Sequence, residues 1–285
     1  IQCEYGSFDL SYVWFKLLPA FEARLLIGSF VREKGLYSPF FLPIDRKMIN
    51  KNLNLKGLRR EFSRDSRVRI EGLLDDDVAE KVAGALLYQT LPLYQAFFSE
   101  GQAKTISVQE CESRSIPEQR ARESERNDLA SRGIGYQYET VMPKYIKNAL
   151  PVANGQGVEV LKELGELFSS AEMIDIVSRI TGKRDVSHAD AQLTRFREGD
   201  FITRHRDEVA HVRRELAYVL SLSPHWHPDW GGLLQFYDHS GRVKGAWTPQ
   251  FNALSLFDIK HIHSVTYVTP FAKEPRWSMT GWFMS

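Results

Sequence analysis

The stretch Arg197-Glu-Gly-Asp-Phe-Ile-Thr-Arg-His-Arg-Asp207 sets the pattern for the C-terminal part of this chain. Residues that favour a turn, Glu198 to Asp200, precede a short run that can form a strand, and this alternation recurs to the end of the sequence. The short runs are 188–197, 201–208, 213–223, 230–238, 242–248, 252–259, 263–269 and 276–283. Eight short strands at this spacing predict a jelly-roll or other double-sheet barrel.

The preceding residues are mostly helical in pattern. Helices are predicted over the ranges 53–65, 75–86, 158–169 and 171–180, the last closed by Gly182. Strands are predicted over 67–73 and 91–99. We therefore expect a mainly β fold with a helical flank, in which residues 48–183 form the flank of a single functional domain and residues 184–285 form its β-core.

Two segments are harder to interpret. Residue 1 is Ile and the first methionine is Met48, from which the chain reads as an ordinary protein start. We expect residues 1–47 to be a non-essential extension, although a genuine N-terminal helix is the alternative. The range 110–133 is highly charged and almost free of large apolar residues, which is typical of a solvated helix or a mobile surface excursion.

Composition excludes several classes of partner. The 285 residues include 37 basic and 36 acidic side chains, so there is no long-range field for nucleic acid or an anionic membrane. The two cysteines, Cys3 and Cys111, cannot form a disulfide framework or a thiolate cluster. Charged residues interrupt the apolar range 10–31, so we predict neither a membrane span nor a signal peptide. A cytoplasmic location is the expectation.

Candidate metal ligands lie within the predicted barrel. His205 and Asp207 are two residues apart, so both side chains face one side of a strand, and His263 opens a later strand. Two imidazoles and one carboxylate are the minimum set that holds Fe(II) and leaves coordination positions open. His261 is an alternative ligand to His263. The turn containing His225 and His227 favours solvated histidines over a second metal site.

Arg276 and Ser278 share one face of the last predicted strand. An arginine buried in a barrel needs an anionic partner, and the distal carboxylate of 2-oxoglutarate would provide one. Together with the three metal ligands, these residues point to an oxygenase that uses iron and 2-oxoglutarate.

The chain from about Leu58 to Ser285 resembles the prolyl 4-hydroxylase-like Fe(II)/2-oxoglutarate oxygenases. It looks most like the branch that holds ribosomal-protein prolyl hydroxylases and their bacterial relatives. The stretches that carry the resemblance are 198–207, 217–226, 229–234, 251–258, 263–265 and 276–283.

The resemblance implies a double-stranded β-helix core with His205, Asp207 and His263 as iron ligands. Arg276, together with Ser278, is then the 2-oxoglutarate-binding residue. Fe(II), 2-oxoglutarate and O₂ would be required, with ascorbate as an accessory reductant. The substrate implied is a prolyl residue of a translation protein. A free amino acid or other small molecule is the alternative within this enzyme class, and a non-catalytic metal- or ligand-sensing barrel is the alternative outside it.

The sequence departs from the resembled families at three positions. Demethylases of nucleobases in this superfamily have a second arginine where this chain has Trp282, which argues against nucleobase repair. Several prolyl hydroxylases use tyrosines to contact 2-oxoglutarate, and the aligned residues here, Phe196 and Ser221, have no phenolic hydroxyl. The oligomeric state is not predicted.

Overall fold

The computed structural model describes residues 48–285 apart from 89–90, 142–155 and 210. The predicted dispensability of residues 1–47 concerns a segment outside this range. In the described part of the chain, no helix combines the length and apolar character that crossing a membrane requires.

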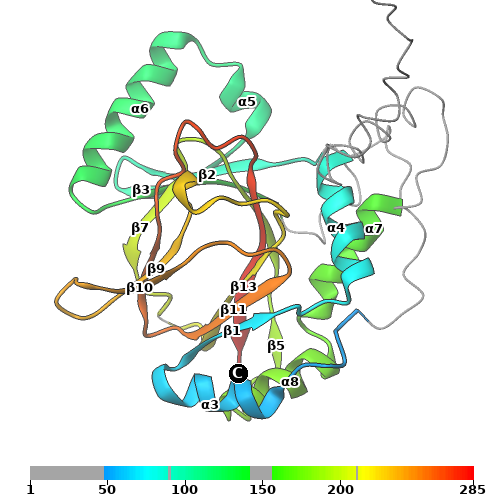
Figure 1. Ribbon diagram of the computed structural model, residues 1–285. Helices are drawn as coiled ribbons and strands as arrows, with labels where there is room; N and C mark the ends of the chain where they lie inside the picture. The colour runs from blue at the N-terminus through cyan, green and yellow to red at the C-terminus, as the bar shows by residue number, and fades with distance from the viewer. Residues whose placement is uncertain (1–47, 89–90, 142–155, 210) are drawn as a thin grey trace, which may run out of the picture. The chain divides into compact units, whose positions relative to one another are not determined.

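A large, mostly antiparallel sheet forms the centre of the structure (Figure 1). Its strands in the N-terminal part are β1 (Arg67–Glu71), β2 (Tyr94–Ser99), β3 (Gln102–Ser107) and β4 (Tyr136–Val141). The next strands are β5 (His188–Ala189), β6 (Gln192–Phe196), β7 (Phe201–His205), β8 (Arg214–Ser221) and β9 (Leu234–Tyr237). The last are β10 (Val243–Trp247), β11 (Ala253–Asp258), β12 (Ile262–Val265) and β13 (Arg276–Met284).

The order of the strands brings distant parts of the sequence together. Along the main path the order is β1-β11-β8-β13-β6-β4-β7-β12-β9-β10. The sheet curls so that β7 and β12 lie across an interior space from β13 and β8 (Figure 1). This is the predicted double-stranded β-helix, and each predicted strand after residue 187 is present.

Helices cover the outer face of the sheet. They are α3 (Leu55–Asp65), α4 (Asp76–Tyr88), α7 (Gln156–Leu167) and α8 (Ala171–Thr181). Helix α4 packs on α7, and α3 packs on α8 and β1 (Figure 1). Gly182 ends α8 in the left-handed conformation, at φ 78°, which glycine adopts without steric cost. The predicted helical flank is therefore confirmed.

Side chains of β13 face both sides of the sheet: one set packs in the core shared with the helices, and the other faces the cavity. Trp277, Met279 and Phe283 are buried in the core shared with the helices. Arg276 and Trp282, an even number of residues apart, line the space on the other face. One strand thus contributes both to the folding energy and to the site.

The charged range 110–133 forms two helices, α5 (Val108–Glu112) and α6 (Ile116–Ser131). Ser115 and Glu118 make a capping box, which satisfies amide groups at the start of α6 and explains how so polar a segment becomes helical. Of the two alternatives raised by the sequence, the structure has the solvated helix.

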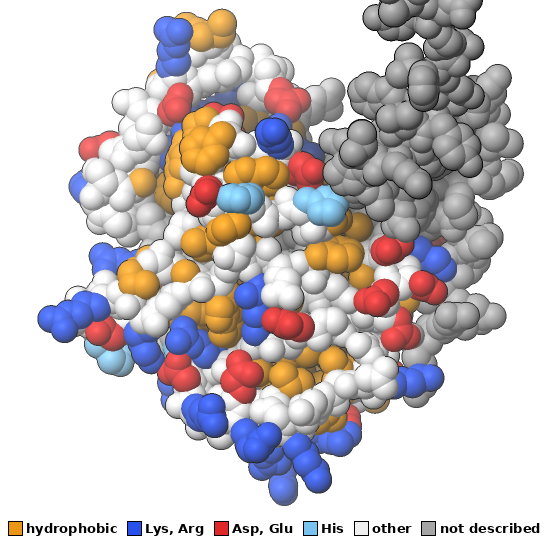
Figure 2. Space-filling view, in the orientation of Figure 1, with side chains coloured by type: hydrophobic (Ala, Val, Ile, Leu, Met, Phe, Trp, Pro, Cys, Tyr) orange, Lys and Arg blue, Asp and Glu red, His pale blue; other side chains and the backbone are white. Residues whose placement is uncertain are grey.

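The N-terminal part also supplies strands that the sequence pattern did not indicate. No strand was predicted over β3 or β4, yet β4 joins β6 to β7 in the sheet. On the face shown in Figure 2, acidic and basic side chains are interspersed, and basic ones gather over α3 at the lower edge.

Candidate metal and co-substrate site

His205 and His263 face each other across the β7–β12 pair. They are register partners, and their ring centroids are 4.2 Å apart. Asp207, two residues beyond the end of β7, places its carboxylate against both rings. His205, Asp207 and His263 offer ligand atoms that all lie within 4.8 Å of one another, which is close enough to share one ion.

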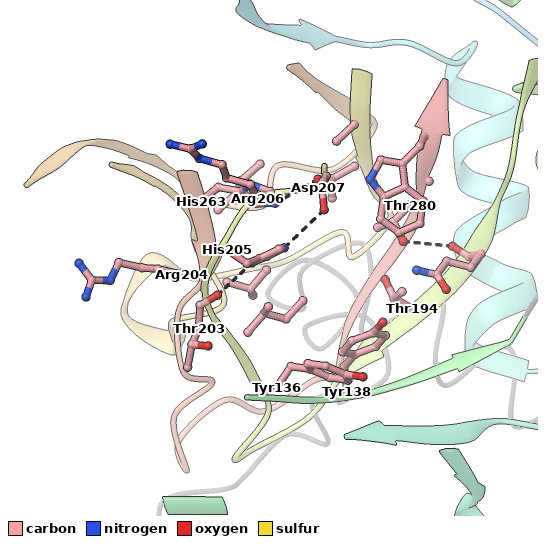
Figure 3. Close-up of a pocket in the computed structure, with 18 of the residues that line it drawn as sticks. Tyr136, Tyr138, Thr194, Thr203, Arg204, His205, Arg206, Asp207, His263 and Thr280 are labelled. Carbon is pink, nitrogen blue, oxygen red and sulfur yellow. Dashed lines mark hydrogen bonds and ion pairs between the residues drawn. The ribbon is translucent and has the colours of Figure 1, made fainter. Parts of the chain in front are cut away.

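Backbone carbonyls fix the orientation of both imidazoles. The Nδ1 atom of His205 lies 2.9 Å from the Thr203 oxygen, and that of His263 lies 3.0 Å from the His261 oxygen. A carbonyl oxygen only accepts, so each Nδ1 carries the proton and each Nε2 has a free lone pair. These Nε2 atoms lie 3.6 Å and 3.4 Å from the Asp207 carboxylate oxygens (Figure 3). Such carbonyl bonds are typical of histidines that bind metal.

Burial and neighbouring charges shift the pKa values of His205, Asp207 and His263. Burial lowers the pKa of His263 to about 4, so its imidazole is neutral at physiological pH. Burial acts to raise the pKa of the Asp207 carboxyl, but His205 and His263 hold it below its ordinary value. Burial also opposes charge on His205, but Asp207 raises the pKa of this imidazole overall. A buried carboxylate beside two imidazoles fits a divalent metal ion.

The alternative histidines point elsewhere. His261 bonds through Nε2 to the Asp65 backbone oxygen at 2.8 Å, so it is not available to the site. His225 and His227 are exposed, and His227 caps a short turn by accepting from the Asp229 amide at 3.2 Å. Among the residues that the structure describes, only the predicted triad forms a group of three ligands suited to a metal.

Arg276 lies on the same interior space, on β13. Its side chain is 2% exposed, and its guanidinium carbon lies 5.2 Å from the ring centre of Phe196, its partner on β6. Its Nε has no hydrogen-bond partner, and no described carboxylate forms an ion pair with it. Burial lowers the pKa of Arg276 to about 10, so the group is still cationic at neutral pH. A buried cation without a partner suits an anionic ligand.

Ser278 is fully buried two residues further along β13. Its hydroxyl also has no hydrogen-bond partner, but Ser278 is not among the residues that line the cavity. The structure therefore brings Arg276 into the site and leaves Ser278 beside it.

The space between these residues is a cavity of about 790 Å³ (Figure 3). The metal-ligand candidates lie at one part of its wall, and Tyr136 and Tyr138 of β4 lie at another. A volume of this size is sufficient for a co-substrate together with part of a second molecule.

Sequence reasoning missed the two tyrosines. Tyr138 stacks on Phe196 with ring centres 5.3 Å apart, and burial raises its pKa to about 12, so its hydroxyl stays protonated. The alternation in Tyr136-Gln-Tyr138-Glu-Thr-Val141 is a strand signal that could have revealed β4. A phenolic hydroxyl therefore lies next to Phe196, which itself has none.

Comparison with known proteins agrees with this geometry. Residues 191–284 match the family model of the 2OG-Fe(II) oxygenase superfamily. Among curated proteins, none matches the chain significantly in sequence.

Several solved structures share the fold. A prolyl hydroxylase from Trichoplax adhaerens, in complex with a hypoxia inducible factor oxygen degradation domain peptide fragment, aligns with a TM-score of 0.52 and 17% identity. The alignment covers 81% of this chain and 88% of that one. A 2OG-Fe(II) oxygenase family oxidoreductase from Burkholderia pseudomallei aligns with a TM-score of 0.50 and 14% identity, covering 84% and 93% of the two chains.

These findings define the class of protein. Residues 191–284 match the model of the 2OG-Fe(II) oxygenase superfamily, and the fold of the chain is like that of the Trichoplax prolyl hydroxylase. The predicted fold and the predicted enzyme class, a 2-oxoglutarate-dependent dioxygenase, are confirmed at this level.

Proposed function

We propose that this protein hydroxylates a C–H bond of a prolyl residue in a translation-related protein. In this proposal His205, Asp207 and His263 hold Fe(II), and Arg276 binds the distal carboxylate of 2-oxoglutarate with Ser278 beside it. One observation carries the proposal: three metal-ligand candidates and an unpartnered buried arginine line the same cavity.

When bound, the iron supplies the oxidising chemistry: O₂ is reduced, 2-oxoglutarate becomes succinate and CO₂, and one oxygen atom enters the substrate. The residues of this chain position the reactants. Thr203 and His261 hold the imidazoles through their carbonyl groups. Arg276 fixes the far end of the co-substrate, so the reacting end is directed to the metal.

The substrate part of the proposal rests on the resemblance and on the fold. The Trichoplax relative is described with a bound peptide, so this fold can present a cavity of this kind to a protein substrate. A cytoplasmic location is proposed from the scarcity of cysteine.

Purified protein, incubated with Fe(II), 2-oxoglutarate, O₂ and ascorbate, provides the test. We expect succinate formation that requires 2-oxoglutarate, and prolyl residues with one added oxygen in a treated proteome, measured by mass spectrometry. Oxygen added to a small molecule alone would contradict the protein substrate. If no succinate forms with any extract as the substrate source, the protein is a sensor and not an enzyme.

A further inference from the structure

Helix α3 presents a row of basic side chains to the solvent. Lys56, Arg60 and Arg64 are four residues apart, so they share one helical face, and Arg59 lies beside them. All four are exposed, and no carboxylate among the described residues forms an ion pair with them. The opposite face packs Phe62 into the core. Packing thus explains the apolar face of α3 and leaves the basic face unexplained.

The helix dipole does not account for these residues either. The first turn of α3 has Lys56 and no acidic residue, although the N-terminus of a helix favours negative side chains. Helix α4 follows this rule, with Asp76 and Asp77 in its first turn. Because the arrangement on α3 gives up this stabilisation, we look for its reason in an interaction outside the helix.

A second group of basic side chains adjoins α3 through the hairpin of β9 and β10. Lys244 on β10 lies 2.8 Å from the Asp65 carboxylate at the end of α3. In the turn of the hairpin, His239 lies 3.2 Å from the guanidinium of Arg206, which follows β7. Basic side chains lie over this hairpin and along the lower edge, over α3 (Figure 2). We define the basic band as the exposed cations that these contacts join: Lys56, Arg59, Arg60, Arg64, Arg204, Arg206, Arg242 and Lys244.

Few carboxylates neutralise the basic band. Glu208 pairs with Arg206 at 3.6 Å, and the Asp65 carboxylate is shared by two cations. The carboxylate of Asp238 accepts hydrogen bonds from amides of its own turn. Glu61 is the remaining acidic residue on α3 outside its C-terminal residue. The eight cations of the band therefore keep a local excess of positive charge.

This local excess is compatible with the balanced charge of the whole chain. At physiological ionic strength, charges more than about 8 Å apart are largely screened in solvent. Acidic residues elsewhere on the surface therefore do not cancel the band for a ligand in contact with it. The balanced composition argues against attraction over long distances, whereas binding at contact depends on the band itself.

We propose that the basic band binds the phosphate backbone of RNA. Guanidinium groups match the geometry of phosphate, and a row of basic residues along a helix is typical of nucleic-acid-binding surfaces. The band extends over β7, the β9–β10 hairpin and α3, which suits a chain of phosphates better than a single anion.

The choice of RNA over an acidic protein rests on the proposed function. A translation-related protein that binds RNA is itself positively charged, so the basic band would repel it and attract the RNA that it carries. Arg204 and Arg206 also line the cavity, and in Figure 3 both side chains point away from Tyr136 and Tyr138. RNA on the band would therefore lie close to the cavity without filling it.

Binding of a labelled single-stranded RNA of about 20 nucleotides to the full chain, measured by fluorescence anisotropy over a range of salt concentrations, tests the proposal. The variant is Lys56→Gln/Arg60→Gln/Arg64→Gln. Each phosphate contact contributes about −0.7 to the slope of log K against log salt, so the slope should become less negative by about 2. At about 0.1 M salt, the Kd should rise at least about 10-fold.

A matched variant controls for the loss of charge. Lys104→Gln/Arg120→Gln/Arg132→Gln removes one lysine and two arginines from β3 and from α6 with its C-cap, outside the band, and should bind RNA as the unaltered protein does. Glutamine keeps a high helix propensity, and circular dichroism checks that both variants are folded. Succinate formation should be unchanged in both, because these residues lie outside the cavity.

Several outcomes overturn the inference. They are no binding of RNA, a salt slope that the α3 variant leaves unchanged, and an equal loss of affinity in the matched variant. Tighter binding of polyglutamate would assign the band to an acidic protein, and tighter binding of DNA of the same sequence would assign it to DNA. Co-sedimentation with phosphatidylserine vesicles in the absence of RNA binding would assign it to a membrane.

Succinate formation by the unaltered protein separates this inference from the proposed function. If succinate forms and RNA does not bind, the role given to the basic band is wrong and the enzyme assignment stands. If RNA binds and no succinate forms with any substrate source, the proposed function fails and the band stands.

Discussion

His205 and His263 are partners across two antiparallel strands, and each imidazole lies within hydrogen-bond distance of the carbonyl two residues before it. The same local geometry thus occurs on both strands. Because these bonds use Nδ1, both Nε2 atoms are left for a metal. The register of β7 and β12 therefore determines the orientation of two of the three proposed ligands.

Replacing the carboxylate ligand should abolish activity. Asp207→Ala removes the anion that the two imidazoles share, so succinate production at ordinary iron concentrations should fall to the background level. The control is Glu208→Ala, which removes an adjacent carboxylate that pairs with the Arg206 side chain at 3.6 Å, and it should retain activity. Turnover that survives in Asp207→Ala means that the ligand assignment is wrong.

Replacing Arg276 should weaken binding of the co-substrate. Loss of one partner of a buried charge pair costs about 2–5 kcal/mol, so Arg276→Ala should raise the Kd of 2-oxoglutarate by at least about 30-fold. Ser278→Ala should have a smaller effect, because Ser278 does not line the cavity. Calorimetry under anaerobic conditions measures both. Arg204→Ala is the control, and an equal loss of affinity in that variant would count against Arg276 as the anchor.

The two ligand histidines should titrate at different pH values in the metal-free protein. Burial lowers the pKa of His263 to about 4, whereas Asp207 raises that of His205 above its ordinary value of 6.5 despite burial. A metal must displace the proton on His205, so metal affinity should fall as the pH drops through the pKa of His205. NMR of the imidazole nitrogens and metal titrations between pH 5 and 8 measure this. An affinity that stays constant to pH 5 would contradict it.

We predict that removal of residues 1–47 leaves folding and activity intact. Truncation beyond this point should not be tolerated. Ile49 is 2% exposed within the core, and the Met48 oxygen accepts a hydrogen bond from the Asp75 amide at 2.9 Å. Chains starting at Met48 and at Leu53 should therefore differ in thermal unfolding, with the shorter one less stable. A loss of soluble protein in the longer one would show that the extension is needed.

Much of the β-core could be predicted because each strand there has its own turn signals and its own alternation. Of the three candidate ligands, His205 and Asp207 were predicted from a strand over 201–208, but β7 ends at His205, so Asp207 joins the group from the residues after the strand and not by strand alternation. His263 was preferred to His261 because a strand follows it and because its spacing to Arg276 fits the resemblance; in the structure, His261 bonds through Nε2 to the Asp65 backbone oxygen.

The strands β3 and β4 were not predicted, because the sequence pattern alone did not distinguish them from the charged residues around them. The pairing of β4 with β6 and β7 is long-range, because those strands lie more than 50 residues away in sequence, whereas β3 pairs with β2, the strand just before it. Local propensity has no access to such partners. The contribution of Tyr138 to the cavity was missed for the same reason.

The most direct test of the central claim is the stoichiometry of iron. Anaerobic equilibrium dialysis against Fe(II) should give one bound iron per chain for the unaltered protein. Variants His205→Ala, Asp207→Ala and His263→Ala, each checked for folding by circular dichroism, should bind much less at the same free concentration. Full retention of iron by all three folded variants would contradict a ferrous site built from these side chains.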